Sequence, residues 1–309
     1  MSRAIAVVIP ARNAAATIGR TLRTLAAQTH PPVEVVVVDD GSTDDTVAIA
    51  ESAGARVLRQ QAEGPGQARN RGAAATTAPL LAFTDADCFP APGWLEEGVR
   101  ALEAADLVQG AVRPERPPGP FDRTLWVERR SGLWESANLL ITRELFEALG
   151  GFEEWVAPSI GKAFGEDMWL GWRAFRRGAA LAFAPGALVE HAVFERGPLA
   201  YAEERRRLRY FPAAVERMPE LRDAFLHARW FLNAATRDFD LALAGSALAA
   251  VRRDARPLAL AAPFALRLAR RAWPHRRHAA AVAAAEVAAH AVGAYSLALG
   301  SIRHRTPVL

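Results

Sequence analysis

The first 113 residues alternate between short apolar runs and segments whose apolar residues have helical spacing. Four runs have the length and composition of strands: 4–10, 33–40, 55–60 and 79–84. Between the first two runs, Ile18, Leu22 and Leu25 recur at helical spacing, which predicts a helix with one buried face. Strands that are separated by helices predict a parallel sheet with right-handed crossovers, and therefore an α/β fold.

Polar side chains follow three of the predicted strands at the point where each strand ends. The segment 10–13 follows the first strand, and Asp39 and Asp40 end the second. Asp85 and Asp87 follow the fourth. A single carboxylate in such a place is commonly a turn former or a helix cap. Because the carboxyl ends of parallel strands meet at one edge of a sheet, the three clusters together predict a ligand site at that edge.

Asp85 and Asp87 are separated by one residue, and they would repel each other unless a cation lay between or beside them. A hard divalent ion, Mg²⁺ or Mn²⁺, takes oxygen ligands and usually completes its shell with water and substrate phosphates. The expected ligand is therefore a nucleotide that carries a diphosphate. The turn after the first strand lacks the glycine-rich fingerprint of dinucleotide-binding sites, so we expect a metal ion to replace the glycines.

Five blocks of sequence follow one another in the order VVIPARNAAATIGRTLRTLAAQ, VVVVDDGSTDDT, GPGQARNRGAA, FTDADCFPAPGWL and GEDMWLGWRAFRRG. Together they closely resemble the family 2 glycosyltransferases of GT-A fold. The resemblance extends to about Phe194, and the order and spacing of the blocks make it specific. It implies a Rossmann-like, mostly parallel sheet flanked by helices, and an inverting enzyme that uses a nucleotide sugar.

The resemblance also implies roles for residues on the donor side. It places the donor pocket at Pro10, Ala11, Arg12, Asn13, Asp40, Arg69 and Asp85. Asp40 is expected at the nucleobase, Arg69 near the diphosphate or the base, and Asp85 near the ribose. Asp87 is expected on the metal, Mn²⁺ or Mg²⁺. Family members often place a histidine near the metal at the end of a later strand, which makes His191 the second candidate ligand; a structural histidine is the competing interpretation.

On the acceptor side, the resemblance implies that Asp167 is the general base that deprotonates an acceptor hydroxyl. Glu166 and Asp167 also lie in the first turn of a predicted helix, where complementation of the helix dipole, worth about 0.3–1 kcal/mol, is the competing interpretation. That dipole would lower the pKa of Asp167, and the neighbouring Glu166 would raise it. Asn138 is expected to face the substrate. Trp169 is interpreted either as a stacking surface for a sugar or as a core residue.

The net charge of +4 is distributed unevenly along the 309 residues. The segment 241–309 carries ten arginines against Asp254 and Glu286, a net charge of +8, so the first 240 residues carry −4. A basic segment can bind nucleic acid or an anionic membrane surface. The acidic remainder argues against nucleic acid, so we expect an anionic membrane surface as the partner of the C-terminal region.

The sequence from residue 196 onward predicts helices outside the five blocks. We expect a GT-A catalytic domain over 1–195, with a nucleotide-sugar half (1–113) and an acceptor half (114–195), and a helical C-terminal extension over 196–309. The alanine-rich stretch 279–302 has the length of a membrane span, about 20 residues. Glu286 and His290 share one face of it, which favours a helix that packs on protein or lies in a membrane interface.

The predicted function is metal-dependent transfer of a sugar from a nucleotide diphosphate, most often UDP in this family, to the hydroxyl of a sugar or lipid-linked acceptor in cell-envelope glycan, polysaccharide or glycolipid synthesis. Processive synthases of the family carry Gln-x-x-Arg-Trp, and Leu226 stands in place of the glutamine here, which favours single additions. A Rossmann-type oxidoreductase and a non-catalytic basic membrane-binding module are the alternatives. The chain opens on a strand pattern without a secretory signal, so we expect a cytoplasmic protein, peripheral at the inner face of the membrane.

Overall fold

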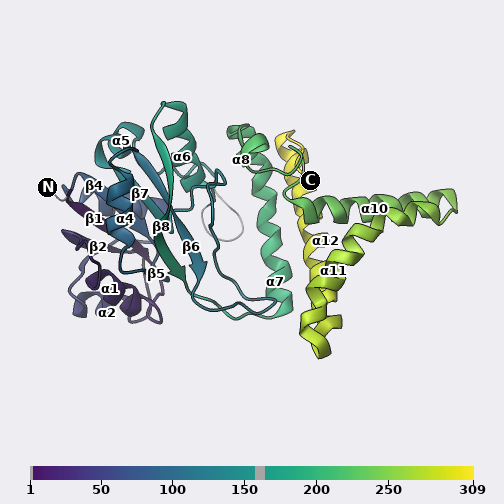
Figure 1. Ribbon diagram of the computed structural model, residues 1–309, viewed down its shortest axis with the longest axis horizontal. Coiled ribbons are helices and arrows are strands. Elements are labelled where there is room, and N and C mark those ends of the chain that lie inside the picture. Colours follow the sequence, from purple (N-terminus) through teal and green to yellow (C-terminus); the bar gives the residue numbers. More distant parts are fainter. Residues whose placement is uncertain (1–2, 157–163) are drawn as a thin grey trace. The chain divides into compact units, whose positions relative to one another are not determined.

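The computed structural model describes residues 3–156 and 164–309 of the chain (Figure 1). These residues form two compact units. The first unit runs to Phe194, apart from the short segment Gly119–Arg123. That segment belongs with Glu195–Leu309 in the second unit. The two units are described separately below.

The first unit is built on an eight-stranded sheet with the strand order β3-β2-β1-β4-β7-β6-β8-β5. Its strands are β1 (Ile5–Ala11), β2 (Glu34–Asp39), β3 (Arg56–Arg59), β4 (Leu80–Thr84), β5 (Cys88–Pro90), β6 (Leu107–Pro114), β7 (Asn138–Thr142) and β8 (Leu181–His191). The four predicted strands are β1 to β4, and they pair in parallel as expected. Antiparallel pairing appears where β7 joins β4 to β6 and where β5 joins β8.

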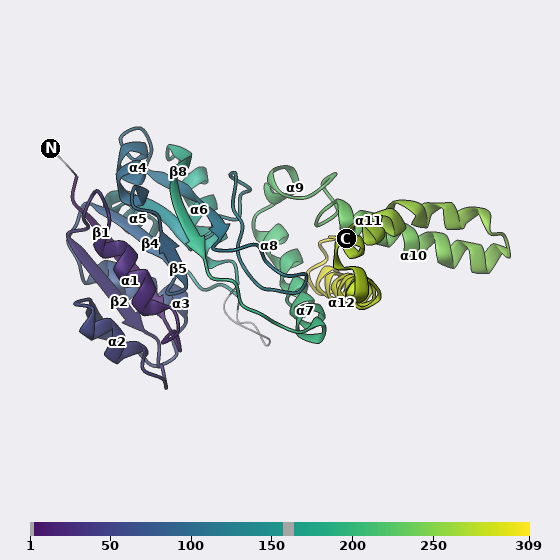
Figure 2. The same ribbon diagram turned by 60° about the horizontal axis from the view of Figure 1, so that its bottom comes forward.

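Helices flank both faces of this sheet (Figure 2). They are α1 (Ile18–Ala26), α2 (Thr46–Ser52), α3 (Pro65–Ala74), α4 (Trp94–Ala101), α5 (Arg143–Leu149) and α6 (Glu166–Arg176). Helix α1 buries Ile18, Leu22 and Leu25 against one face, as their spacing predicted. On the other face α3 lies so close to β1 that a Cβ added at Gly72 would be 2.3 Å from Cγ1 of Val8. The fold is therefore α/β with a mixed, mostly parallel sheet.

The second unit consists mainly of helices. They are α7 (Pro198–Glu204), η1 (Arg205–Tyr210), α8 (Phe211–Arg217), α9 (Leu221–Ala224), α10 (Ala234–Arg252), η2 (Arg256–Ala261), α11 (Ala262–Ala272), η3 (Trp273–His278) and α12 (Ala279–His304). Small residues such as Ala289, Gly293 and Ser296 form the buried face of α12. A Cβ added at Gly300 would lie 2.2 Å from the carbonyl oxygen of Arg209, so only glycine permits this close packing on η1.

The polar residues of α12 are held inside the second unit. Glu286 accepts hydrogen bonds from the hydroxyl of Tyr201 and from Nε of Arg271, each at 3.0 Å. The ring of His290 stacks on Phe239, with ring centroids 5.4 Å apart. Among the described residues, one helical run, Arg256–His304, has the length and hydropathy of a membrane span. The helix of a soluble protein can meet the same criteria, and the contacts of Glu286 are those of a helix packed on protein.

Candidate active site

The carboxyl edge of the sheet brings together the polar clusters that follow β1, β2 and β4. Ala11 at the end of β1 pairs with Asp39 at the end of β2, and Val8 pairs with Phe83 near the end of β4. Asp40 and Asp85 come directly after these strands, so their side chains start from the same edge. The predicted meeting of the three clusters is confirmed.

Asp40 is buried and anchors the loop that precedes α3. Its Oδ1 accepts hydrogen bonds from Nε2 of Gln60 and from the backbone N–H of Glu63, both at 2.7 Å. The N–H of Gly64 donates to its Oδ2 at 3.2 Å, and NH1 of Arg12 lies 4.0 Å from the same oxygen. The carboxylate therefore shapes the pocket wall, and the expected contact between Asp40 and a nucleobase remains a prediction.

The turn after β1 is tied to the turn after β2 through Asn13. The backbone N–H of Asn13 donates to Oγ of Ser42 at 2.9 Å, and the N–H of Thr43 donates to Oδ1 of Asn13 at 2.8 Å. Asn13 adopts a left-handed conformation, with φ of 50°, which asparagine tolerates better than most residues. Pro10 and Ala11 lie in β1, at the base of this double turn, so the segment 10–13 lines the edge as expected.

Arg69 of α3 is buried and connects carboxylates from both halves of the site. Its NH2 donates to Oδ1 of Asp85 at 2.6 Å, and its NH1 lies 3.8 Å from Oε1 of Glu166. Burial alone would lower the pKa of Arg69, but Asp85, Glu166 and Asp167 raise it above its ordinary value. Nε and NH1 have no hydrogen-bond partner among the described residues. These buried N–H groups can donate to an anionic ligand.

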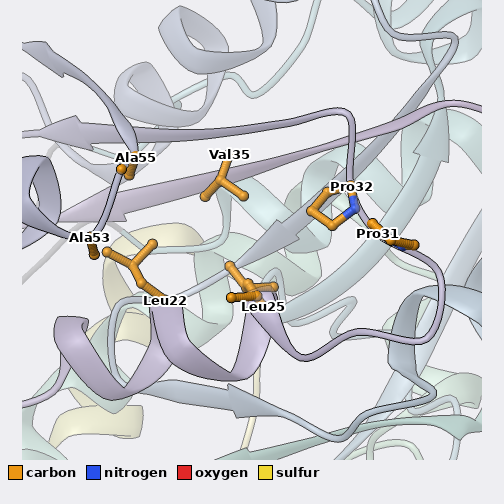
Figure 3. Close-up of a pocket in the computed structure, with 9 residues that line it drawn as sticks. Leu22, Leu25, Pro31, Pro32, Val35, Ala53 and Ala55 are labelled. Carbon is orange, nitrogen blue, oxygen red and sulfur yellow. The ribbon is translucent and has the colours of Figure 1, made fainter.

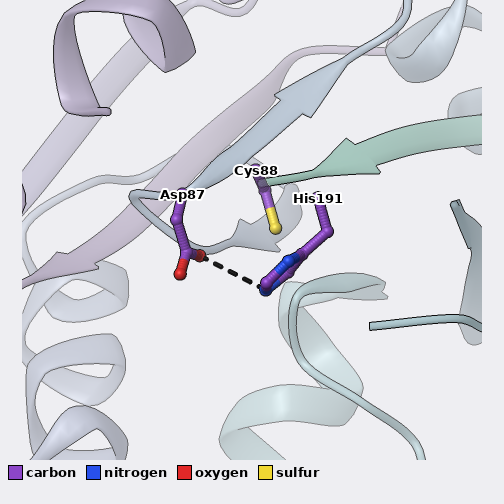
Figure 4. A group of neighbouring side chains, drawn as sticks. All are labelled: Asp87, Cys88 and His191. Atoms are coloured by element: carbon purple, nitrogen blue, oxygen red, sulfur yellow. Dashed lines mark ion pairs between the residues drawn. The ribbon is translucent and has the colours of Figure 1, made fainter. Parts of the chain in front are cut away.

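A candidate metal site lies where β5 pairs with β8 (Figure 4). Cys88 pairs with His191, and this register brings Nε2 of His191 to 3.7 Å from Oδ1 of Asp87. Nδ1 of His191 lies 2.6 Å from the carbonyl oxygen of Ala192, which assigns the proton to Nδ1 and leaves the lone pair of Nε2 facing Asp87. One ligand atom from each of Asp87, Cys88 and His191 lies within 4.8 Å of the others.

The donor set at this position fits Mn²⁺ best. Carboxylate oxygen and neutral imidazole are both ligands of Mn²⁺, whereas Mg²⁺ prefers oxygen alone. The third group, Cys88, is a fully buried thiol. Burial, and then the charges of Asp85 and Asp87, raise its pKa well above the ordinary value, so it remains a neutral thiol. Asp87 and His191 are therefore the residues that fit the ion.

Asp167 lies in the first turn of α6. Its Oδ2 accepts a hydrogen bond from the backbone N–H of Ser136 at 3.3 Å, and its Oδ1 accepts one from the N–H of Met168 at 2.8 Å. Burial, and then the neighbouring Glu166 carboxylate, raise the pKa of Asp167 to about 8 against the opposing effect of Arg69. A carboxyl with a pKa near neutrality can accept a proton from a hydroxyl and release it again.

Comparison with known proteins points to one family. Residues 6–150 match the family described as "Glycosyl transferase family 2", so this part of the chain carries the sequence pattern of that family. The chain is 30% identical over 207 residues to glycosyltransferase AglE of Haloferax volcanii, covering 60% of this chain and 66% of the relative. It is 31% identical to the pre-mycofactocin glycosyltransferase of Mycobacterium tuberculosis, over 61% of this chain and 43% of that protein.

Solved structures agree with the GT-A fold. The mannosyltransferase PcManGT from Pyrobaculum calidifontis, in complex with GDP-Man and Mn²⁺, matches 94% of this chain and 87% of its own with a TM-score of 0.65 and 24% identity. Glucosyl-3-phosphoglycerate synthase from Mycobacterium tuberculosis, in complex with Mn²⁺, UDP and phosphoglyceric acid, matches 68% of this chain and 78% of its own, with a TM-score of 0.50 and 25% identity. These structural relatives bind Mn²⁺ together with a nucleotide or nucleotide sugar. The matched part of the chain spans less than two thirds of the length of each of the two curated relatives.

One expected acceptor-side residue does not face a substrate. Asn138 is fully buried at the start of β7. Its Nδ2 donates to the carbonyl oxygens of Ala111 and Ala187, both at 2.8 Å, and its Oδ1 accepts from Nε1 of Trp94 at 2.7 Å. The expectation for Asn138 was therefore wrong, because its side chain forms hydrogen bonds that connect neighbouring strands.

Two other acceptor-side residues remain at the site. Glu166 is buried beside Arg69, where it pairs with NH1, so it acts on Asp167 through its charge. Trp169 is half-buried on α6 and donates from Nε1 to Oε2 of Glu153 at 2.8 Å. The guanidinium groups of Arg173 and Arg176 lie over its ring. The expected stacking of a sugar on Trp169 stays a prediction.

Sequence reasoning missed the residues of the β6–β7 connection that hold the two ends of the site. Ser136 donates to Asp167, and Oγ1 of Thr124 lies 3.3 Å from Nδ1 of His191. Glu135 contributes to the raised pKa of Asp167. None of these residues belongs to a recognisable motif, because their role depends on how an irregular segment returns to the sheet.

A separate pocket lies between α1 and the start of β2 (Figure 3). It has a volume of about 230 Å³, and Leu22, Leu25, Pro32 and Val35 are among its lining residues. Pro32 and Val35 lie at the amino end of β2, whereas the candidate site lies at the carboxyl end. The pocket is lined by apolar residues without titratable groups, so it has no part in the chemistry proposed below.

Proposed function

We propose that the protein is an inverting, metal-dependent glycosyltransferase that moves a sugar from a nucleotide diphosphate to an acceptor hydroxyl. One observation carries this proposal. The Asp87–His191 pair, suited to a metal ion, and Asp167, a carboxyl with a pKa near 8, lie at one edge of the sheet, and Arg69 pairs with Asp85 and Glu166 between them. A cation site, a buried guanidinium and a base are what displacement of a diphosphate by a hydroxyl requires.

The residues of the chain divide the reaction between them. Asp87 and His191 would hold Mn²⁺, which supplies positive charge to the departing diphosphate when it is bound. Arg69, whose Nε and NH1 have no hydrogen-bond partner among the described residues, would donate to the same anionic part of the donor, and it keeps Asp85 in place. Asp167 takes the proton from the acceptor hydroxyl as its oxygen forms the new bond to the anomeric carbon. Attack from the side opposite the leaving diphosphate would invert the configuration of that carbon.

We propose a UDP-sugar as the donor. The similarity to glucosyl-3-phosphoglycerate synthase, which was solved with Mn²⁺ and UDP, supports this choice. The alternative of a Rossmann-type oxidoreductase is disfavoured because the turn after β1, Arg12 to Ala16, contains no glycine that would let a dinucleotide approach the backbone. A purely membrane-binding module leaves the carboxyl-edge cluster without a role.

The proposed acceptor is a sugar or a lipid-linked sugar of the cell envelope, and the proposed location is the cytoplasmic face of the membrane. Two features of the second unit support this. Its segment 241–309 carries a net charge of +8, and several large apolar side chains in it are exposed, including Val251 and Trp273, both 83% exposed. Basic and apolar groups together favour an anionic lipid surface.

A thermal-shift screen tests the function. UDP, GDP, their sugars and NAD⁺ would each be added to the full chain with Mn²⁺, with Mg²⁺ and with EDTA. We expect a nucleoside diphosphate to raise the melting temperature with Mn²⁺ and to have little effect with EDTA, because ligand binding to the native state stabilises it. A shift with NAD⁺ alone would instead support the oxidoreductase. No shift with any nucleoside diphosphate and Mn²⁺ would reject the proposal.

A further inference from the structure

The connection between β6 and β7 runs from the metal side of the site to the base. Partway along it, Oγ1 of Thr124 lies 3.3 Å from Nδ1 of His191. At its end, the backbone N–H of Ser136 donates to Oδ2 of Asp167 at 3.3 Å. An acceptor whose hydroxyl reaches Asp167 therefore lies next to this segment, 124–137.

A pocket of about 200 Å³ lies within the segment. Its lining residues are Trp126, Val127, Glu128, Arg129, Ser131 and Glu135. Val127 pairs with Val112 of β6, so one wall of the pocket is fixed to the sheet. Glu135, on the other wall, is adjacent to Ser136 and therefore close to Asp167. The pocket is thus part of the acceptor half and is distinct from the donor residues around Asp40.

Glu135 has an unfulfilled hydrogen-bonding capacity in this pocket. Its Oε2 is buried and has no hydrogen-bond partner in the part of the chain that the structure describes. Burial raises the pKa of the Glu135 carboxyl above its ordinary value. A buried polar atom without a partner costs free energy, and a ligand hydroxyl that hydrogen-bonds to it would remove that cost.

Trp126 supplies the second feature of the pocket. Its side chain is 56% exposed, although tryptophan offers a large apolar surface that proteins usually cover. An indole face beside carboxylate, hydroxyl and guanidinium groups matches the mixed surface of a sugar ring, whose C–H groups pack on aromatic rings while its hydroxyls form hydrogen bonds. An apolar molecule would use the ring but would leave the polar groups unpaired.

We propose that this pocket binds a sugar ring of the acceptor, with the ring packed on Trp126 and a hydroxyl hydrogen-bonded to Glu135. The inference rests on the proposed transferase function and deepens it. Glu135 acts here as a binding residue and Asp167 remains the base. The small volume of the pocket holds one ring of the acceptor, so further parts of that molecule extend beyond it.

Calorimetric titration of the full chain with glycosides, in the presence of UDP and Mn²⁺, tests the pocket directly. The probes are four octyl glycosides, of glucose, galactose, mannose and N-acetylglucosamine. The variants are Trp126→Ala and Glu135→Gln. We expect at least one glycoside to bind the wild-type protein, and each variant to bind it about tenfold more weakly, because an aromatic contact or a hydrogen bond to a charged group contributes on this scale.

The matched controls are Trp273→Ala and Glu103→Gln, which change exposed residues outside the pocket. Both controls should bind the glycoside like the wild-type protein. The affinity of each protein for UDP with Mn²⁺ is measured in parallel. If UDP does not bind the wild-type protein, the transferase function fails. If UDP binds normally but no glycoside binds, or if either pocket variant binds glycoside as well as the wild-type protein does, the pocket assignment is overturned.

Discussion

The Asp87 carboxylate and the His191 ring approach each other at 3.7 Å, a distance that suits two ligands of one ion better than a direct hydrogen bond. We predict that Asp87→Ala weakens binding of UDP in the presence of Mn²⁺ by at least about tenfold and leaves metal-free binding unchanged. Calorimetric titration of UDP with Mn²⁺ and with EDTA measures both values.

Asp45→Ala is the control for this experiment. Asp45 is an exposed carboxylate in the turn between β2 and α2, and its side chain makes no capping hydrogen bond to α2. It should bind UDP like the wild-type protein. The melting temperature of Asp87→Ala should stay near the wild-type value, since a partly exposed residue after a strand contributes little to the core. Equal UDP affinities with and without Mn²⁺ in the wild-type protein would contradict the metal assignment.

Asp167 must be ionised to act as a base, and its pKa is raised to about 8. We predict that the transfer rate rises with pH and levels off above about pH 8, as the ionised fraction of Asp167 becomes complete. Asp167→Asn should lower kcat by roughly 10²- to 10⁴-fold and keep UDP affinity. A loss of UDP affinity as large as the loss of kcat would assign Asp167 to the donor pocket or to folding.

The same shift predicts how stability depends on pH. The pKa of Asp167 is about 8 in the folded protein and near 3.8 in the unfolded chain, so between these values the folded state holds a proton that the unfolded state has lost. The contribution of Asp167 to the free energy of unfolding therefore falls as pH rises from about 4 to about 8. Asp167→Asn removes this effect, and we expect the variant to gain stability relative to wild type over that range, as measured by urea unfolding.

Among the strands, Asn138 joins β7 to the strands around it through three buried hydrogen bonds. We predict that Asn138→Ala lowers the free energy of unfolding by at least about 3 kcal/mol, because each buried group left without a partner costs about 1–3 kcal/mol. Asn233→Ala, which removes one helix N-cap in α10, should cost about 1 kcal/mol. Urea unfolding of both variants measures the difference.

The acceptor KM distinguishes this structural role from the role expected from the sequence. Under conditions where Asn138→Ala is folded, its KM for an acceptor glycoside should remain near the wild-type value. Unchanged stability with a raised acceptor KM would mean that Asn138 does face the acceptor. We expect acceptor binding to depend on the connection 124–137 instead of on Asn138.

Over the whole molecule, the net positive charge is concentrated in the second unit. Helices α10 and α11 form a hairpin in this unit, joined through η2 (Figure 1). Arg252, Arg253 and Arg256 lie at its turn and are exposed. The hairpin also exposes large apolar side chains: Leu243, Leu248, Val251, Leu258, Leu260 and Leu266. Exposed apolar and basic groups on one hairpin are the combination that binds an anionic lipid surface.

We predict that the full chain co-sediments with phosphatidylglycerol vesicles at low salt and less at high salt. Replacing Arg252, Arg253 and Arg256 with glutamine should weaken binding by about two orders of magnitude, since each basic residue near such a surface is worth about 1 kcal/mol. Glutamine at Arg23, Arg71 and Arg177, exposed arginines of the first unit, removes equal charge and should leave binding nearly unchanged. A wild-type chain that stays in the supernatant at low salt would contradict the proposed location.

Much of the first unit follows from local patterns in the sequence. The apolar runs of β1 to β4 and the spacing of Ile18, Leu22 and Leu25 predict their own elements, because burial on a strand or one helix face leaves a periodic trace. The common edge of Asp40 and Asp85 also follows from the sequence. Parallel strands place their carboxyl ends at one edge of the sheet whatever the details of packing, so residues that follow such strands start from that edge.

Contacts between irregular or antiparallel segments leave no such trace. The pairing of β5 with β8 brings His191 to Asp87, and the return of the segment 124–137 brings Ser136 and Glu135 to Asp167. Each depends on the register of chains that are distant in the sequence, which no local period encodes. Asn138 shows the same limit, because an asparagine beside a motif is equally suited to a substrate and to a buried carbonyl. In the folded protein Asn138 bonds to Trp94, Ala111 and Ala187, so it has the structural role. Polar groups that are buried at this position need hydrogen-bond partners.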